Sequence, residues 1–190
     1  RSNLLNGLVD IARAAGEVVM KHYSGEITLR RKADASPVTA ADEEAEELIL
    51  RRLGEEMPAI PVIAEESVAA GRIPQIADTF FLVDPLDGTK EYISRNGEFT
   101  VNIALVQNRV PVAGVVYAPA IGRLFWGADG EAFERSNETT RRIRTREIPP
   151  AGMTAVASRS HRDPQTDEFL ARHKVDNIVS AGSSLKFCVI

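Results

Sequence analysis

The sequence of 190 residues predicts a layered α/β fold of the α+β kind, in which helix layers and sheet layers alternate. Three observations predict it. Two segments with helical periodicity, over about 3–21 and 39–53, open the chain. Short strands separated by proline and glycine turns then run from 99 to 148, as in an antiparallel meander. Beyond 150 the pattern returns to strand, helix, strand and helix, which indicates a second sheet covered by helices.

A boundary near Pro149 divides the predicted fold, because the Pro149-Pro150 pair ends the last strand of the meander. We expect residues 1–149 to form an N-terminal α+β domain with two helices, the meander and a metal site. Residues 150–190 are expected to form a C-terminal α/β domain. The chain stops at Val189-Ile190 within an apolar helix face, so we expect this domain to be incomplete and the fold truncated there.

The composition excludes several classes of protein. The net charge of −4, without a basic stripe, argues against a protein that binds nucleic acid. We interpret Arg141, Arg142, Arg144 and Arg146 as the solvent face of a strand, because they alternate. The single cysteine, Cys188, cannot form an internal disulfide, which fits a reducing compartment such as the cytoplasm. No apolar run reaches membrane-spanning length, and no signal peptide opens the chain.

The first two helices follow from periodicity and capping. The segment 3–21 carries its apolar residues on one face, which predicts an amphipathic helix with one buried stripe. The polar stretch 24–36 predicts a hairpin or loop. The second helix begins at Thr39, where Thr39 and Asp42 match a capping box that satisfies otherwise unpaired backbone amides. Gly54 is a typical helix end.

Residues 58–66 predict a short apolar strand that ends in two acids, Glu65-Glu66. Adjacent carboxylates at a strand end are usually solvated, and that interpretation stays open. However, an acid directly after Val62-Ile63-Ala64 matches the position of Asp84 after the next apolar strand. Two strands that deliver carboxylates to the same edge of a sheet would form a cation site.

The stretch from 80 to 89 carries the strongest chemical signal. Its apolar strand is predicted to stop at Asp84-Pro85, because proline has no amide hydrogen for the ladder. Asp84 and Asp87 then flank a turn that contains the Leu86 carbonyl. Converging carboxylates repel each other unless a cation lies between them, and Mg2+ prefers oxygen ligands of this kind. An isolated D-x-x-D-G-T pattern, however, is more often only a turn followed by a helix cap.

The residues after this turn suit an anion. Residues 88–93 are compatible with a short helix, and its free amides, beginning at Gly88 and Thr89, would face a phosphate. The elements predicted beyond it are strands at 99–105, 112–117, 124–127, 132–135 and 143–148, a strand at 153–157, a helix at 164–173, a strand at 177–180, and a last helix capped by Ser183.

The sequence lacks the motifs of several common enzyme classes. It contains no P-loop, no G-x-G-x-x-G, no H-E-x-x-H and no nucleophile elbow. An aspartyl-phosphate enzyme would use one aspartate as its nucleophile. The haloacid-dehalogenase phosphatases do so with a D-x-D spacing, whereas two residues, one of them proline, separate Asp84 from Asp87 here.

Taken together, these motifs resemble a known family. Glu65-Glu66 and Asp84 to Thr89, preceded by residues 32–42, resemble the lithium-sensitive, Mg2+-dependent phosphatases related to inositol monophosphatase. Within that superfamily, the segments 87–92 and 182–188 resemble the 3'(2'),5'-bisphosphate nucleotidases of the CysQ type. Inositol phosphatases usually carry Thr-Asn where this chain has Lys-Glu after Asp-Gly-Thr. The resemblance covers the whole chain in order.

The resemblance implies a layered inositol-monophosphatase-like sandwich and hydrolysis of adenosine 3',5'-bisphosphate to AMP and phosphate in support of sulfate assimilation. It implies two or three Mg2+ ions as cofactors and inhibition by Li+. The implied partner is a small phosphorylated nucleotide, not a nucleic acid. The implied location is the cytoplasm or the cytoplasmic face of the inner membrane, with peripheral association but no spanning segment. The sequence does not set the oligomeric state.

The resemblance also assigns residues. Glu65, Asp84, the Leu86 carbonyl and Asp87 would hold the metal ions. Thr89 and Asp42 would orient the attacking water, so the implied catalytic residues are Glu65, Asp42 and Thr89. The substrate would contact Glu65, Leu86, Asp87, Gly88, Thr89, Lys90, Gly182, Ser183 and Lys186.

Two alternatives stay open. Members of this family continue past Lys186 to a Trp-Asp element whose aspartate is a further metal ligand, and the present sequence ends before it. One alternative keeps the fold but takes an inositol phosphate or a sugar bisphosphate as substrate, with Lys90 and Lys186 as the discriminating residues. The other is a catalytically inactive binding module.

Overall fold

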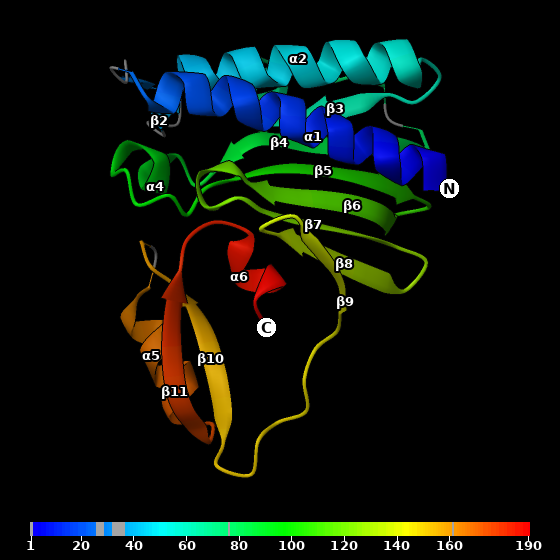
Figure 1. Ribbon diagram of the computed structural model, residues 1–190. Coiled ribbons are helices and arrows are strands. Elements are labelled where there is room, and N and C mark those ends of the chain that lie inside the picture. Colours follow the sequence, from blue (N-terminus) through cyan, green and yellow to red (C-terminus); the bar gives the residue numbers. More distant parts are fainter. Residues whose placement is uncertain (1, 26–28, 32–36, 76, 161) are drawn as a thin grey trace.

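A computed structural model describes residues 2–25, 29–31, 37–75, 77–160 and 162–190. Two long helices lie over one face of a seven-stranded sheet, and a smaller unit with a parallel strand pair lies on the other side (Figure 1). The predicted layered α+β fold is therefore confirmed. None of the described helices is long and apolar enough to cross a membrane.

The helix layer consists of α1, Ser2–Tyr23, and α2, Ala40–Glu56. Both predicted helices are confirmed, but the predicted end at Gly54 is wrong. A Cβ at Gly54 would meet nothing within 4 Å, and Gly54 has no positive φ, so the helix simply continues. It ends where the Met57 N–H bonds to the Leu53 carbonyl. The core lies between these helices and the sheet, and its fully buried side chains include Leu8, Ile11, Ile49, Leu53 and Phe81.

The large sheet has the order β3-β4-β5-β6-β7-β8-β9. Its strands are β3 Val62–Ala64, β4 Thr79–Asp87, β5 Thr100–Gln107, β6 Val110–Ala118, β7 Arg123–Ala128, β8 Glu131–Ser136 and β9 Thr139–Ile143. From β4 onward each strand pairs antiparallel with the next, which confirms the predicted meander. Only β3 pairs in parallel with β4, among the strands described in this sheet.

The last strand of the meander lies earlier than predicted. We expected a strand over 143–148, but β9 ends at Ile143. Asn137 and Glu138 both have positive φ, so they form a two-residue hairpin turn that starts β9 at once. The predicted single arginine face is therefore wrong. Arg141 and Arg142 lie on β9 and are exposed, but as neighbours they point to opposite faces, and Arg144 and Arg146 follow the strand.

The N-terminal sheet and the connecting helices are short. Strands β1, Leu29–Arg31, and β2, Pro37–Thr39, pair antiparallel, so the second strand lies beyond the range 24–36 in which a hairpin or loop was expected. Residues 26–28 and 32–36 of that prediction lie outside the described part of the chain. Helix α3 is Glu65–Ala69, α4 is Thr89–Ile93, and a 3-10 turn, η1, covers Pro119–Ile121.

The C-terminal unit consists of β10, Met153–Ser158, α5, Pro164–Ala171, and β11, Val175–Ala181. The two strands pair in parallel, as expected for a strand–helix–strand unit. A short α6, Leu185–Cys188, follows. Ser184 occupies its N-cap position, so the predicted cap at Ser183 is wrong by one residue, although the Leu185 N–H bonds to the Ser183 hydroxyl at 3.3 Å.

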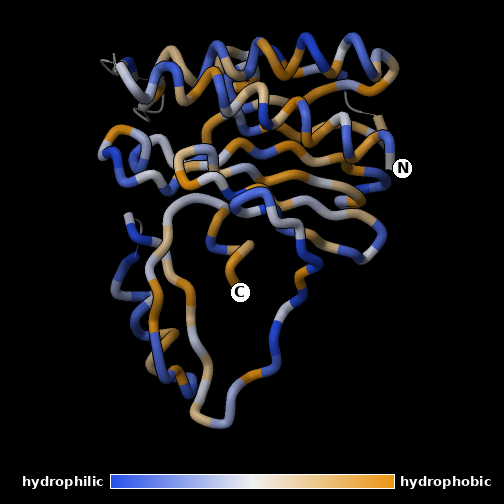
Figure 2. The backbone as a smooth tube through the Cα atoms, viewed as in Figure 1, coloured by the Kyte–Doolittle hydropathy of each residue, from blue (hydrophilic) through white to orange (hydrophobic). Residues whose placement is uncertain are grey.

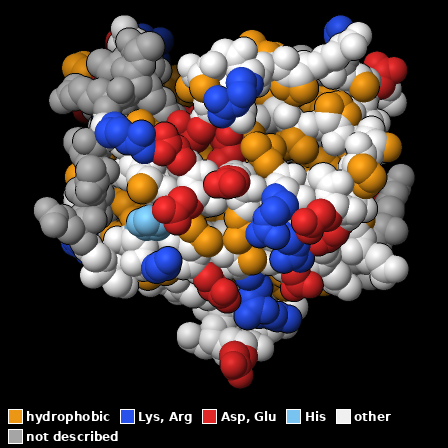
Figure 3. Space-filling view, turned by 90° about the horizontal axis from the view of Figure 1, so that it is seen from above, with side chains coloured by type: hydrophobic (Ala, Val, Ile, Leu, Met, Phe, Trp, Pro, Cys, Tyr) orange, Lys and Arg blue, Asp and Glu red, His pale blue; other side chains and the backbone are white. Residues whose placement is uncertain are grey.

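The segment 144–149 joins the two units without regular structure and is exposed along most of its length. It is largely hydrophilic, whereas apolar residues follow the strands of the sheet (Figure 2). The predicted domain boundary near Pro149 falls at its end and stays a prediction. On the face above α1 and α2, acidic and basic side chains alternate with apolar ones (Figure 3).

Candidate metal and phosphate site

Two acids come directly after a matched pair of residues on two parallel strands. In the β3–β4 pair Ala64 lies opposite Val83. Glu65 directly follows β3, and Asp84 is the next residue within β4. Burial is the main reason that the pKa of Asp84 is raised, and the nearby Glu65 side chain raises it further. Glu65 is also the first residue of α3, which we had not expected, because the sequence predicted only a strand end there. The shared sheet edge that the sequence predicted for these two acids is therefore present.

A bulge in β4 brings Asp87 to the same edge. Asp84 lies opposite Asn102 and Asp87 lies opposite Thr100, so β4 uses one more residue than β5 between these pairs. The prediction that the strand stops at Asp84-Pro85 is wrong. Pro85 lies within the bulge, where its missing amide hydrogen costs no ladder bond. Because Thr100 and Asn102 share one face of β5, the bulge turns both aspartates to that same face.

Asp87 is held from a distant part of the chain. The Ser184 N–H donates to Asp87 Oδ2 at 2.5 Å. The Ser184 hydroxyl lies 2.9 Å from Thr100 Oγ1 and donates to Asn102 Oδ1 at 2.8 Å. Ser184 therefore joins the turn after β11 to the two β5 residues that face the aspartates.

The turn at Gly88 opens α4. Gly88 has φ of 92° and occupies the N-cap, a backbone conformation that favours glycine. Thr89 Oγ1 lies 3.4 Å from Asp42 Oδ1 and 3.4 Å from the Leu86 carbonyl oxygen. These long hydrogen bonds bring the start of α4 to the start of α2.

Asp42 forms the predicted capping box and does more than cap. Its Oδ2 accepts from the Thr39 N–H at 2.8 Å and from the Thr39 hydroxyl at 2.7 Å. Its Oδ1 faces Thr89. Asp42 is buried, with 2% of its surface exposed, so the bonds to Thr39 fix the position of the oxygen that Thr89 meets.

Glu46 lies one helical turn further along α2 and is also buried. Its carboxylate accepts from the Glu66 N–H at 2.7 Å, the Ser67 N–H at 2.7 Å and the Ser67 hydroxyl at 2.6 Å. Helix α3 has no capping side chain of its own, because Ala64 stands at its N-cap. Glu46 therefore caps α3 from another helix and fixes the segment that carries Glu65.

The electrostatics of the site favour a cation. Burial raises the pKa of Asp84 well above its usual value, and the charges of Glu65 and Asp87 raise it further. Burial also raises the pKa of Asp87, while the Ser184 amide and the Lys186 charge act in the opposite direction. Buried carboxylates that lie close together repel each other when ionised, and a cation between them stabilises their charged form.

The donor set consists of oxygen ligands of the kind that Mg2+ prefers. Among the described residues, no three Asp, Glu, His or Cys side chains form a ready-made metal-binding group. Mg2+ is usually held by one or two carboxylates together with waters and substrate phosphate, so a pair such as Glu65 and Asp84 fits it without a third acid. A cavity of about 700 Å³ extends from Glu65, Asp84 and Ser184 along the sheet face.

The C-terminal residues singled out in the sequence lie beside this edge. A Cβ at Gly182 would be 2.5 Å from Glu91 Cγ, so the turn passes directly over α4. Ser183 is buried and has φ of 50°. The Lys186 ammonium donates to the Ser183 carbonyl at 2.6 Å. Lys90, in contrast, is exposed on α4. Among the predicted site residues that the structure describes, Glu65 is exposed as well.

The sequence analysis did not single out several polar residues that organise the site. They are Glu46, Glu91, Glu98, Asn102, Arg159 and Ser184. Glu46 and Glu91 are buried acids. In the sequence, the only signal for their burial is that they fall on the apolar faces of their helices. The pairing of Glu98 with Arg159, separated by 61 positions, has no local signal at all.

The model of the inositol monophosphatase family matches residues 1–190. The chain belongs to the inositol monophosphatase family. Among curated members of this family, the 3'(2'),5'-bisphosphate nucleotidase CysQ of Salmonella typhimurium is 43% identical over 189 residues, covering 98% of this chain and 76% of that protein. The protein of the same name from Escherichia coli strain K12 is 41% identical over the same shares of the two chains.

Solved structures of the inositol monophosphatase family agree. CysQ from Bacteroides thetaiotaomicron matches with a TM-score of 0.79 and 38% identity, covering 99% of this chain and 76% of that one. The IMPase of Thermotoga maritima matches with a TM-score of 0.80 and 25% identity, covering 96% and 69%. The resemblance inferred from the sequence motifs is therefore confirmed at the level of family and fold.

Proposed function

We propose that this protein is a Mg2+-dependent phosphatase that hydrolyses the 3'-phosphate of adenosine 3',5'-bisphosphate to give AMP and phosphate. The observation that carries the proposal is the 43% identity, over 98% of the chain, to a relative that is named 3'(2'),5'-bisphosphate nucleotidase. The acidic edge formed by Glu65, Asp84 and Asp87 supports it, because a phosphatase of this kind needs a cation beside an anion site. The reaction would support sulfate assimilation.

We assign metal binding to Glu65, Asp84, the Leu86 carbonyl and Asp87. When bound, two or three Mg2+ ions would neutralise charge on the phosphate oxygens and make a bound water more acidic. Li+ would inhibit by competing for the same oxygens. The hydrogen bond from Ser184 to Asp87 and the cap of Glu46 on α3 hold these ligands in place before binding.

Thr89 and Asp42 would orient the attacking water. The Thr89 hydroxyl faces Asp42 Oδ1, so it can donate to that carboxylate and keep its oxygen free to accept from water. Asp42 can act in this way because Thr39 holds its other oxygen. Glu65, at the start of α3, would receive the proton that the water releases.

The phosphate would bind at the backbone amides of Gly88 and Thr89. Lys186 is suited to a second phosphate, since its ammonium already lies beside the site and its charge opposes the rise in pKa that burial causes at Asp87. Gly182 and Ser183 would contact the substrate from the turn after β11. A role for Lys90 requires its exposed side chain to fold back over α4.

The test is phosphate release from adenosine 3',5'-bisphosphate with Mg2+, comparing the protein with Asp87→Asn. We expect the variant to lose at least about a hundredfold in kcat/KM, because a metal ligand is removed. Asp10→Asn is the control, since Asp10 is an exposed acid on α1 away from the site. Retained turnover in Asp87→Asn would contradict the metal assignment.

The alternative substrates are separated by the two lysines. If Lys186 meets a second phosphate, Lys186→Gln should lower kcat/KM for adenosine 3',5'-bisphosphate far more than for an inositol monophosphate. Lys90→Thr should change that preference less. An equal loss on both substrates in Lys186→Gln would favour an inositol phosphate. A sugar bisphosphate, which also carries a second phosphate, is separated by assaying it directly beside adenosine 3',5'-bisphosphate. Tight binding of Mg2+ and AMP by calorimetry without any turnover would favour a binding module.

A cytoplasmic location, or peripheral association with the cytoplasmic face of the membrane, is proposed from the single cysteine and from the resemblance.

A further inference from the structure

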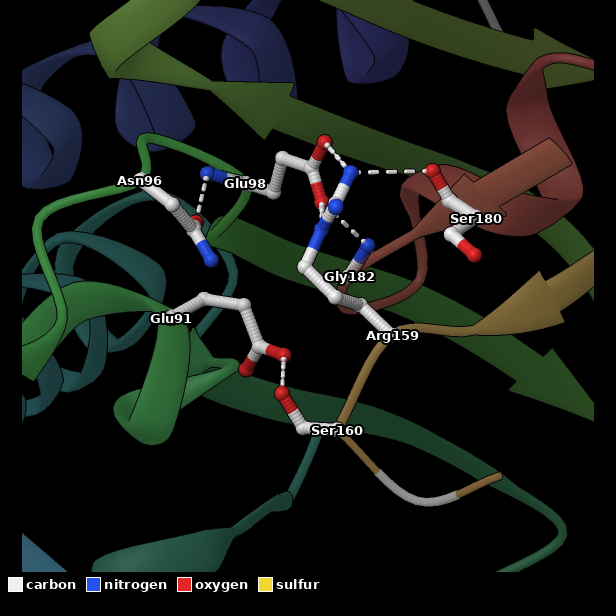
Figure 4. Close-up of polar contacts among 7 residues, drawn as sticks. All are labelled: Glu91, Asn96, Glu98, Arg159, Ser160, Ser180 and Gly182. Carbon is white, nitrogen blue, oxygen red and sulfur yellow. Dashed lines mark hydrogen bonds and ion pairs between the residues drawn. The ribbon is translucent and has the colours of Figure 1, made fainter. Parts of the chain in front are cut away.

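Two units of the molecule are joined by an ion pair between Glu98 and Arg159 (Figure 4). Glu98 precedes β5 in the large sheet, and Arg159 directly follows β10 in the C-terminal unit. Arg159 Nε donates to Glu98 Oε2 at 2.9 Å and Arg159 Nη2 donates to Glu98 Oε1 at 2.8 Å. Two parallel hydrogen bonds fix the orientation of the guanidinium relative to the carboxylate as well as their distance, whereas a lysine would fix only the distance.

The same two side chains also hold the turn that leaves β11. Glu98 Oε2 accepts from the Gly182 N–H at 2.7 Å. Arg159 Nη2 donates to the Ser180 carbonyl at 3.1 Å, and the Arg159 N–H donates to the Ala181 carbonyl at 3.2 Å. Residues 180–182 are therefore fixed by side chains of both units.

The path of this turn is constrained by packing. A Cβ at Gly182 would be 2.5 Å from Glu91 Cγ and 2.8 Å from the Glu98 carbonyl oxygen, so only glycine fits. The Ser160 hydroxyl donates to the buried Glu91 carboxylate beside it. Figure 4 shows both acids reaching from the α4–β5 side toward the ends of β10 and β11. The turn has little freedom while these contacts persist.

Two residues beyond Gly182, the chain reaches the site, where the Ser184 N–H donates to Asp87 Oδ2. We infer that Glu98 and Arg159 are positioning residues of the proposed phosphatase site, because their ion pair holds the turn 180–184 so that Ser184 fixes Asp87. Neither side chain touches the reacting atoms. The effect on catalysis rests on the proposed function. Whether the ion pair restrains the turn 180–184 can be tested without any assay of activity.

Amide hydrogen exchange tests the hold directly. In Arg159→Ala we expect the Gly182 and Ser184 amides to exchange at least about tenfold faster than in the unaltered protein, because the turn is released. Arg159→Lys should fall between the two. Arg172→Ala is the control, since Arg172 forms an exposed ion pair with Glu168 in the same unit and should leave both amides unchanged. Unchanged exchange of the Ser184 amide in Arg159→Ala would overturn the inference.

The consequence for the site is measured by metal binding. The Mg2+ concentration that gives half of the maximal thermal stabilisation should rise about tenfold or more in Arg159→Ala, as is typical when an outer-shell contact to a ligand is lost. We expect Glu98→Gln to raise it as well, and the double variant to be no worse than the more affected single variant, because both act through one turn. If the increases in the required Mg2+ concentration in the two single variants add in the double variant, Glu98 and Arg159 do not act through one shared turn.

These readouts separate the two ideas. If the unaltered protein shows no response to Mg2+ and no turnover, the proposed function fails, while the exchange of the Ser184 amide still decides whether the ion pair holds the turn. If the unaltered protein responds to Mg2+ and Arg159→Ala binds Mg2+ equally well, the positioning role fails while the proposed function stands.

Discussion

At the scale of single residues, Asp87 shows how the site is held. It lies at the end of a bulge in β4 and accepts a hydrogen bond from Ser184, which is 97 positions further along the chain. Asp42 is also held from outside its own backbone, because Thr39 donates to it through both a backbone amide and a hydroxyl. The acids at this edge are therefore positioned by donors around them as much as by their own strands.

Gly182 can be tested at this scale. We expect Gly182→Ala to lower the stability by about 1–3 kcal/mol, because the added methyl group would overlap Glu91 and the Glu98 carbonyl. Gly54→Ala is the matched control, since a methyl group there meets nothing within 4 Å and alanine favours a helix. Thermal unfolding should show a lower Tm for the first variant and an equal or higher Tm for the second. Equal values for both would contradict the packing described at the turn.

The ion pair of Glu98 predicts a dependence on pH. The hydrogen bond from Arg159 lowers the pKa of Glu98 below its ordinary value of 4.5. A lowered pKa means that the stabilisation is present above pH 4.5 and is lost as the pH falls through the lower value in the folded protein. The difference in Tm between the unaltered protein and Arg159→Ala, measured without Mg2+, should therefore shrink as the pH falls from 7 toward 3.5. A difference that grows toward acid pH would refute this.

At the scale of elements, α2 connects the two halves of the acidic edge. Asp42 in its first turn faces α4, and Glu46 one turn later caps α3. The two carboxylates lie on the same side of the helix because their spacing is four residues. One rigid helix therefore fixes the distance between the segment that carries Glu65 and the segment that carries Thr89.

Replacing Glu46 should disturb α3. Glu46→Gln removes the charge that three donors of Glu66 and Ser67 now share, and we expect a loss of about 2 kcal/mol. Glu47→Gln, at an exposed position on the same helix, should change the stability by less than about 0.5 kcal/mol. Urea unfolding measures both. If the two variants unfold alike, Glu46 does not hold α3.

The elements with strong local patterns could be predicted from the sequence. The apolar periodicity of α1, the capping box of α2 and the alternation in β5 each locate an element without knowledge of the rest. The strand β4 could not be followed past Pro85, because a proline within a bulge looks the same in the sequence as a proline that ends a strand. Similarly, β9 depends on Asn137 and Glu138 both adopting positive φ, which is a property of the hairpin as a whole.

At the scale of the whole molecule, two units are joined by the segment 144–149 and by the contacts around Glu98 and Arg159. The candidate site could be predicted in part, because Glu65, Asp84 and Asp87 belong to recognisable motifs at strand ends. Its supports, such as Glu46 and Arg159, could not be predicted, since their partners are brought near only by the packing of complete layers.

Limited proteolysis tests the division into two units. Arg144 and Arg146 are exposed and lie in a segment without regular structure, so trypsin should cut native protein there before it cuts within the sheet or α2. Mass spectrometry of the earliest fragments from the described region identifies the site. Early cleavage after Arg51 or Arg123, within regular elements, would contradict a boundary near Pro149.

The single extra residue in β4 also explains why the spacing of three between Asp84 and Asp87 works at all. In a regular strand residues three apart point to opposite faces, so without the bulge one of the two carboxylates would enter the apolar side of the sheet. A homologue with a single residue between the two acids needs no bulge, because acids two apart share a face in a regular strand. Straightening β4 while both intervening residues stay should therefore separate the two carboxylates, even though neither acid is replaced.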